Sequence, residues 1–305
     1  MANKILYQLV KRPGDSTMVL LTFIATLIIM AILTVILTTI GIFGAPHVSL
    51  DFLIKAPEEG MTEGGIYPAI VGTTLLVITM SIMGLPVGLI TAVFLHEYAG
   101  EKSKLANIVR FAVNNLAGVP AIVYGIFGLS FFVFFLGTQI DSLFYGGNLK
   151  WGKPALIWAS CTMALLTLPV VIVSVEEALR TVTRDEREAA YALGATHWEV
   201  VHRVVIPKAL GGILTGGILA VSRGAGEVAP VLFTGAAYFL PELPRSFSDQ
   251  FMEMGYHIFV MSTQSHDIDA TKPIQFATTL VLLLLTFSLN FVAVLMRRRI
   301  RITRR

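Results

Sequence analysis

Long apolar runs separated by short charged segments dominate this chain of 305 residues. A membrane-spanning helix needs about 20 mostly apolar residues, and six runs reach that length. They are Ser16–Leu50, Gly64–Leu95, Phe111–Ile140, Pro154–Val175, Ala209–Leu240 and Pro273–Met296. The first run is too long and uniform for a cleaved signal peptide, so we expect a retained helix. The pattern predicts an all-α polytopic membrane protein with six transmembrane helices.

The composition supports this class and excludes others. Charged residues make up 14% of the chain, whereas ordinary soluble domains have about 25%. Hydrophobic residues make up 55%, and the mean hydropathy is +0.74. This composition argues against a soluble fold, disorder or nucleic-acid binding. Cys161 is the single cysteine and the six histidines are scattered, so we expect no disulfide, metal site or cofactor.

The basic residues lie mostly on one side of the predicted spans. Seventeen of the 23 Lys and Arg residues fall in the tails and in the loops after spans two and four. They are Lys4, Lys11, Arg12, Lys102, Lys104, Arg110, Arg180, Arg184, Arg187, Arg203, Lys208, Arg297, Arg298, Arg299, Arg301, Arg304 and Arg305. The positive-inside rule therefore predicts that both termini are cytoplasmic. The predicted organisation is a tail over 1–16, a six-span domain over 17–296 and a basic tail over 297–305.

The loop over 176–208 is dense in charge and has a helical pattern. An acidic start at Asp185 and strong helix formers predict a short helix that Gly194 ends. A second short helix follows over 195–203, in which Thr196 and Glu199 have the spacing of a capping box. We expect Pro207 to break this run before the fifth span. The loop is thus predicted to be a compact helix–Gly–helix unit.

This loop resembles the EAA loop of ABC-importer permeases. The matching residues are Glu188, Ala189, Ala190 and Gly194, followed after nine residues by Val204-Val-Ile-Pro207. The resemblance implies a MetI-like type I importer fold with cytoplasmic coupling helices. It also implies ATPase contacts through Glu188, Ala189, Ala190, Gly194, Ala195, Thr196, His197 and Trp198. The chain has no nucleotide-binding Gly-x-x-x-x-Gly-Lys-Ser/Thr motif, so we expect no enzyme activity here and ATP hydrolysis by a partner chain.

Two other segments resemble permeases for phosphate. The third run contains Gly118, Pro120 and Gly125 at the spacing of a phosphate-permease signature, with Ala121 where that family usually has Ser. The fifth run contains Ser222-Arg-Gly-Ala-Gly-Glu-Val-Ala-Pro230, which is similar to a second signature of that family. The short N-terminal tail and the run Glu227-Val-Ala-Pro-Val-Leu-Phe-Thr234 resemble PstA-type more than PstC-type subunits. The resemblance implies a heterodimer with a PstC-like permease, two ATPase copies, an external phosphate-binding protein and a bacterial inner-membrane location.

Arg223 and Glu227 carry the candidate chemistry of the pathway. Charges inside a membrane span are costly and usually mark function. The two residues are four apart, so we expect them on one helix face. Gly224, Gly226 and Pro230 surround them, where the backbone can open and approach a solute. Arg can donate to phosphate oxygens, and a carboxylate can accept from the hydroxyl of hydrogen phosphate but repels sulfate. A structural ion pair between helices is the alternative. Glu176 and Glu177, at the inner end of the fourth span, either line the pathway or only extend their charges to the membrane surface, and Glu177 is the further candidate for the pathway.

Other functions remain open at this stage. A permease for molybdate, sulfate or phosphonate is the nearest alternative. An autonomous transporter, a channel or an intramembrane enzyme is the other, although such proteins have no need of an ATPase-docking loop. The acidic outer loops over 44–65 and 241–272 suit either a protein partner or plain solvation.

Overall fold

Helices dominate this computed structural model, which describes residues 13–100, 103–265 and 267–302. Six of the helical stretches are long and apolar enough to cross a membrane. They are Thr17–His47, Tyr67–Tyr98, Ala121–Phe144, Leu156–Arg180, His197–Gly224 and Ile268–Val292. The six-span prediction is confirmed, whereas the cytoplasmic orientation of the termini stays a prediction. Lys4, Lys11, Arg12, Lys102, Arg304 and Arg305 lie outside the described residues, as do most of the first tail and the end of the second.

The described residues form a series of helices and one pair of short strands. The α-helices are α2 (Pro13–Gly44), α3 (Leu50–Ile54), α4 (Tyr67–Val93), α5 (Lys104–Leu116), α6 (Ala121–Gly128), α7 (Thr138–Phe144), α8 (Leu156–Arg180), α9 (Arg184–Ala192), α10 (His197–Val200), α11 (Ile206–Gly224), α12 (Ala229–Thr234), α13 (Met254–Thr263) and α14 (Ile268–Ile302). Short 3-10 turns are η1 (Ala45–His47) and η2 (Glu59–Met61), and π-helical segments are η3 (Phe94–Tyr98), η4 (Leu129–Gly137) and η5 (Val201–Val205). The strands β1 (Pro57–Glu58) and β2 (Glu63–Gly64) form one antiparallel pair.

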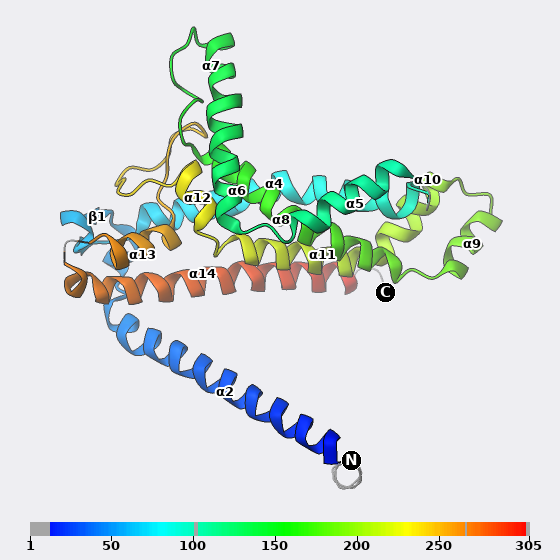
Figure 1. Cartoon of the computed structure of the whole chain (residues 1–305), viewed down its shortest axis with the longest axis horizontal. Coiled ribbons are helices and arrows are strands. Elements are labelled where there is room, and N and C mark those ends of the chain that lie inside the picture. Colours follow the sequence, from blue (N-terminus) through cyan, green and yellow to red (C-terminus); the bar gives the residue numbers. More distant parts are fainter. Residues whose placement is uncertain (1–12, 101–102, 266, 303–305) are drawn as a thin grey trace.

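The core of the bundle lies around α8, which packs against α4 and α11. Small residues allow the close approach, because an added Cβ at Gly88 would lie 2.5 Å from a methyl carbon of Val171, and one at Gly216 would lie 2.4 Å from the Ser174 Cβ. Helices α4, α8, α11 and α14 run along the long axis of the molecule, with α9 and α10 at one end and α13 with the β-hairpin at the other (Figure 1). The continuous run α6–η4–α7 stands across this axis (Figure 1).

Among the described residues, helix α2 packs against the rest of its own chain only near its C-terminal end. It meets α14 at its C-terminal end, where the rings of Phe43 and Phe276 lie 5.5 Å apart, and then diverges from the bundle (Figure 1). None of its most apolar 18-residue window is buried. Lipid or another chain must therefore cover this apolar helix in the membrane.

The third predicted span begins too early. Phe111–Leu116 belongs to α5, a separate amphipathic helix, and the membrane-length helix starts only at Ala121. The break lies at Ala117–Pro120, where Pro120 is the N-cap of α6. Apolarity is continuous across this break, so the pattern of hydrophobic residues alone did not reveal it.

The fifth predicted span is wrong at both ends. The helix starts at His197 and continues through η5 and α11, with Pro207 in the first turn of α11 instead of at a break. The π-helical segment η5 precedes α11 and shifts the pattern of backbone hydrogen bonds. Pro207, which has no backbone N–H, therefore fits in the first turn of α11. At the other end α11 stops at Gly224, because Gly224-Ala-Gly226 has low helix propensity, and Pro230 then lies in the first turn of α12.

Candidate functional site

The loop between α8 and α11 forms the predicted helix–Gly–helix unit. Gly194 has φ +85°, a left-handed conformation that ends α9, and no atom lies within 4 Å of a Cβ built there. The Thr196 hydroxyl accepts from the Glu199 N–H, and the Glu199 side chain accepts from the Thr196 N–H. The capping box and the glycine stop are thus confirmed.

The tip of this loop is exposed and partly apolar. Helix α9 buries none of its residues, and Leu193 and Trp198 are 89% and 61% exposed. Glu188, Ala189, Gly194, Thr196 and His197 are also exposed, and Ala190 and Ala195 are half-buried. Leu193 was not singled out from the sequence, because one leucine among helix formers carries no signal. Exposed apolar side chains on a charged loop suit a contact with another protein.

Buried ionic contacts hold the loop against the end of the second span. Arg187 donates from Nη1 to both carboxylate oxygens of Glu97 at 2.8 and 2.6 Å, and from Nη2 to the Leu179 carbonyl. The Glu97 side chain is only 3% exposed. His197 Nε2 lies 3.1 Å from the Glu97 carbonyl oxygen, and His197 Nδ1 lies 2.6 Å from the Tyr191 hydroxyl. The contacts of Arg187 and His197 with Glu97 join residues 90 and 100 positions apart, so sequence spacing could not indicate them.

Arg223 and Glu227 lie at the break between α11 and α12. Arg223 Nε is 3.7 Å from Glu227 Oε1, and the side chains are 59% and 27% exposed in the single chain. The expectation that both share one helix face is wrong, since the helix ends at Gly224 and Glu227 follows in a turn. The turn nevertheless keeps the charges close. The Arg223 and Glu227 side chains lie at a break between two helices and are accessible from outside the chain. Together they form a polar patch of the kind that contacts an anion.

Two of the signature residues meet across the fold. A Cβ at Gly125 in α6 would lie 2.9 Å from the Ala229 carbonyl oxygen and 3.0 Å from the Pro230 Cα in α12. The third-run and fifth-run signatures therefore form one contact. Pro120 starts α6, and Gly118 lies in the preceding turn with only the Asn115 carbonyl oxygen near a built Cβ. Of these residues, Gly125 and Pro230 are positioned by close packing, and Gly118 is not.

At the C-terminal end of α8 the two adjacent glutamates differ. Glu177 is exposed, whereas Glu176 is buried and lies 3.5 Å from Arg110 of α5. The sequence alone does not distinguish these two residues, because they are adjacent at the end of an apolar helix, and Glu177 stays a predicted pathway residue. Within the described part of the chain, no group of three or more His, Cys, Asp or Glu side chains could hold a metal ion.

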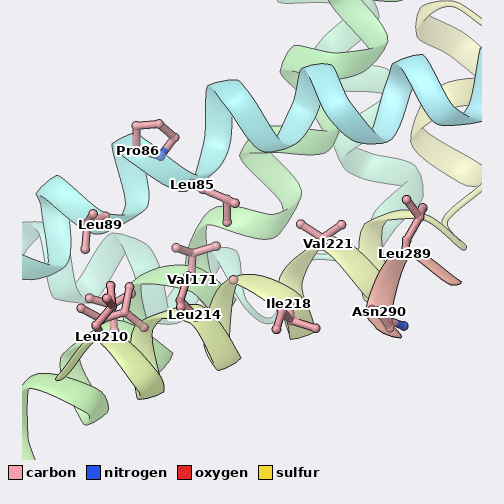
Figure 2. A pocket seen from close by; sticks show the side chains of 13 residues that line it. Leu85, Pro86, Leu89, Val171, Leu210, Leu214, Ile218, Val221, Leu289 and Asn290 are labelled. Carbon is pink, nitrogen blue, oxygen red and sulfur yellow. The ribbon is translucent and has the colours of Figure 1, made fainter. Parts of the chain in front are cut away.

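An apolar groove of about 430 Å³ lies between α4, α8, α11 and α14 (Figure 2). Leu85, Pro86 and Leu89 of α4 and Leu214 and Ile218 of α11 are among the residues that line it (Figure 2). Asn290 of α14 is a polar residue of the lining, and its Oδ1 accepts a hydrogen bond from the Ser222 hydroxyl. Ser222 directly precedes Arg223 in the chain. The lining has almost no groups that could replace the hydration of an anion, so the groove itself is unsuited to bind phosphate.

Residues 84–302 match the family of binding-protein-dependent transport system inner membrane components. The chain belongs to this family. The phosphate transport system permease protein PstA of Pasteurella multocida is 35% identical over 222 residues, which are 72% of this chain and 73% of that protein. PstA of Haemophilus influenzae is 33% identical over 225 residues, 73% of this chain and 74% of that protein. Within the family, the chain is of the PstA type.

Solved permeases share the fold. A chain of a bacterial alginate ABC transporter, solved with an alginate pentasaccharide-bound periplasmic protein, has a TM-score of 0.66 at 14% identity and covers 92% of this chain and 94% of that chain. A chain of the inward-facing MetNI methionine ABC transporter has a TM-score of 0.53 at 19% identity, over 77% of this chain and 94% of that chain. The predicted MetI-like fold is confirmed.

Proposed function

We propose that this chain is the permease subunit of an ATP-driven phosphate importer of the bacterial inner membrane. Membership of the PstA-type permeases is the observation that carries the proposal. The chain supplies spans for the pathway and no catalytic site. A separate ATPase subunit hydrolyses ATP and drives the transport.

The exposed loop is the proposed ATPase contact. Glu188, Ala189, Ala190, Gly194, Ala195, Thr196, His197 and Trp198 form it, together with Leu193. The buried Arg187–Glu97 ion pair supports this role, because it ties the loop to the second span. A displacement of the loop by the ATPase would then pull on α4 as well as on α8 and α11. A loop without such a tie would act on α8 and α11 alone and would not pull on α4.

Arg223 and Glu227 are the proposed phosphate contacts, and Gly118, Pro120, Gly125 and Pro230 shape the helix breaks beside them. Arg223 offers N–H donors to the phosphate oxygens, and Glu227 accepts from the hydroxyl of hydrogen phosphate. The exposure of Arg223 in the single chain supports a place on the pathway, since an ion pair with a purely structural task inside a bilayer would be enclosed by its own bundle. Glu177 is a further proposed pathway residue at the inner end.

The proposed assembly pairs this chain with a PstC-like permease and two ATPase copies. An exposed α2 and an exposed Arg223 support a second permease subunit that covers these surfaces alongside lipid. An external phosphate-binding protein would dock at the end that carries α13 and the β-hairpin (Figure 1). The excess of basic residues in the tails and in this loop supports a cytoplasmic position for both termini and the α9–α10 loop in the proposed arrangement.

Uptake measurements in a strain that lacks this chain test the proposal. Labelled phosphate uptake at low external phosphate should be lost and should return when the chain is supplied on a plasmid. Sulfate and molybdate uptake in the same cells serve as controls and should not change. Loss of sulfate or molybdate uptake with normal phosphate uptake would assign the chain to another oxyanion.

A further inference from the structure

A small polar cavity lies at the inner end of the bundle, apart from Arg223 and Glu227. It has a volume of about 210 Å³ and lies between α5, η3 and α8. Its charged and polar lining comes from Arg110 and Asn114 on α5 and from Glu176 and Arg180 on α8. Each of these pairs is four residues apart, so each helix presents its pair on one face. Arg180 is exposed, and the cavity therefore opens at the surface.

Glu176 is the unusual member of this cavity. The residue is only 9% exposed, and its Oε1 is fully buried without a hydrogen-bond donor among the described residues. Arg110 Nη2 lies 3.5 Å away but donates to the Leu95 carbonyl at 2.7 Å instead. A buried carboxylate oxygen without a donor is costly. The cavity wall thus carries a carboxylate whose acceptor capacity the described residues leave partly unused.

The two guanidinium groups define the charge of that bound group. Arg110 uses one of its N–H donors on Leu95, which leaves donors for a ligand. With one carboxylate and two guanidinium groups, the lining carries a net positive charge. An oxyanion that retains a proton can accept from Arg and donate to Glu. Hydrogen phosphate has both features, whereas sulfate has no proton to donate.

We propose that Arg110, Asn114, Glu176 and Arg180 form an inner binding site for hydrogen phosphate. This inference rests on the proposed phosphate transport and adds a second site, at the end where the α9–α10 loop lies. The ion would stop there after it leaves the Arg223–Glu227 region. A phosphomonoester lipid headgroup has the same chemistry, so the test below separates the two sources.

Equilibrium binding of labelled inorganic phosphate tests the site. The complete transporter, without its external binding protein, is placed in phosphatidylcholine nanodiscs, and all variants carry Arg223→Gln to weaken the first site. Arg110→Gln and Arg180→Gln should each lower the remaining phosphate affinity about tenfold or more, as expected for lost charged hydrogen bonds. Arg298→Gln removes an exposed charge elsewhere at the inner end and is the matched control. Equal binding by Arg180→Gln and Arg298→Gln would overturn the proposal.

Two further arms complete the experiment. Glu176→Gln should let sulfate compete with phosphate, because the amide no longer repels a fully ionised anion; unchanged competition would contradict the assigned role of Glu176. A second set of nanodiscs contains phosphatidic acid. If the protein with an intact cavity retains this lipid but binds no free phosphate, the assignment to the free ion is overturned. ATPase co-purification verifies assembly of each variant. If phosphate binds through the cavity residues but cells show no phosphate uptake, the inner site stands and the transport proposal fails. If uptake is normal but no binding depends on the cavity residues, the transport proposal stands and the inner site is overturned.

Discussion

Arg187 and Glu97 lie 90 residues apart in the chain, and two contacts of 2.6 and 2.8 Å join them beneath the α9–α10 loop. The Glu97 side chain is almost fully buried, so this pair is not a surface ion pair that salt would screen. It fixes the first helix of the loop to the end of the second span. The loop and the bundle are therefore mechanically connected at a second place besides α8 and α11.

Arg187→Gln should uncouple the loop and destabilise the protein. Removal of one partner from a buried ion pair leaves the other charge uncompensated and costs roughly 3–5 kcal/mol. Lys208→Gln is the matched control, because Lys208 pairs with Glu186 near the surface and such pairs contribute less than about 1 kcal/mol. Thermal unfolding and ATP-driven uptake would be measured for both variants. Equal behaviour of the two would contradict the structural role of the Arg187–Glu97 pair.

Substitutions at Gly194 should depend on backbone conformation and not on side-chain volume. The residue has φ +85° with open space around it, so an added side chain strains the backbone but meets no neighbour. Gly194→Val should reduce ATPase co-purification strongly, whereas Gly194→Asn should reduce it little, since Asn tolerates the left-handed region. Equal loss in both variants would show that the ATPase contact itself excludes a side chain here.

Gly125→Ala should disturb the contact between the third and fifth membrane segments. Its new Cβ would lie 2.9 Å from the Ala229 carbonyl oxygen, so α6 and α12 would have to separate. Gly211→Ala is the control within α11, where no atom lies within 4 Å and the change favours the helix by roughly 0.5–1 kcal/mol. Thermal unfolding should show a lower midpoint for Gly125→Ala and an equal or higher one for Gly211→Ala. A lower midpoint for both would contradict the packing argument.

Glu253 and His257 should give opposite pH dependences at the other end of the bundle. Burial raises the pKa of the Glu253 carboxyl from 4.5 to about 7, so the folded state holds an extra proton between these values and its stability falls as the pH rises. Burial lowers the pKa of His257 from 6.5 to about 4, so its contribution rises with pH between 4 and 6.5. In the native chain the two largely cancel below pH 6.5.

Glu253→Gln should therefore expose the dependence on His257. The thermal midpoint of the variant should rise between pH 5 and 6.5 and stay level above it, whereas that of the native chain should fall between pH 6.5 and 7. Glu242→Gln, which alters an exposed acid paired with Arg245, should follow the native profile. A Glu253→Gln profile identical to the native one would mean that the carboxyl titrates near its ordinary pKa.

The sequence predicted the local features of this fold well. The six spans, the stop at Gly194 and the capping box at Thr196 depend on residues close together in the chain, so short-range rules describe them. The break after Gly224 was missed for a physical reason. Hydropathy reports the surroundings of a residue and not its backbone, and an irregular segment inside a bundle can be as apolar as a helix.

The contacts between distant segments could not be predicted in the same way. In the sequence, Glu97 is an acidic residue at the end of a predicted span with no sign of a partner. Only the fold brings Arg187 into contact with it. Glu176 and Glu177 are equivalent in sequence, and only the packing of α5 against α8 buries one and exposes the other. Motifs therefore identified residues that lie close together in the structure, such as Gly125 and Pro230. They did not identify the distant residues that pair with charged groups, such as Glu97 with Arg187.

The central claim is that Arg223 and Glu227 contact phosphate, and a double-mutant comparison tests it most directly. Labelled phosphate uptake would be measured in membranes with verified assembly for Arg223→Gln, Glu227→Gln and the double variant. We predict that Arg223→Gln abolishes uptake, that Glu227→Gln weakens it, and that the double variant recovers nothing, because each residue has its own task. A structural pair behaves differently, since a lone charge in the membrane is worse than none. Phosphate uptake by the double variant above that of either single variant would contradict the account.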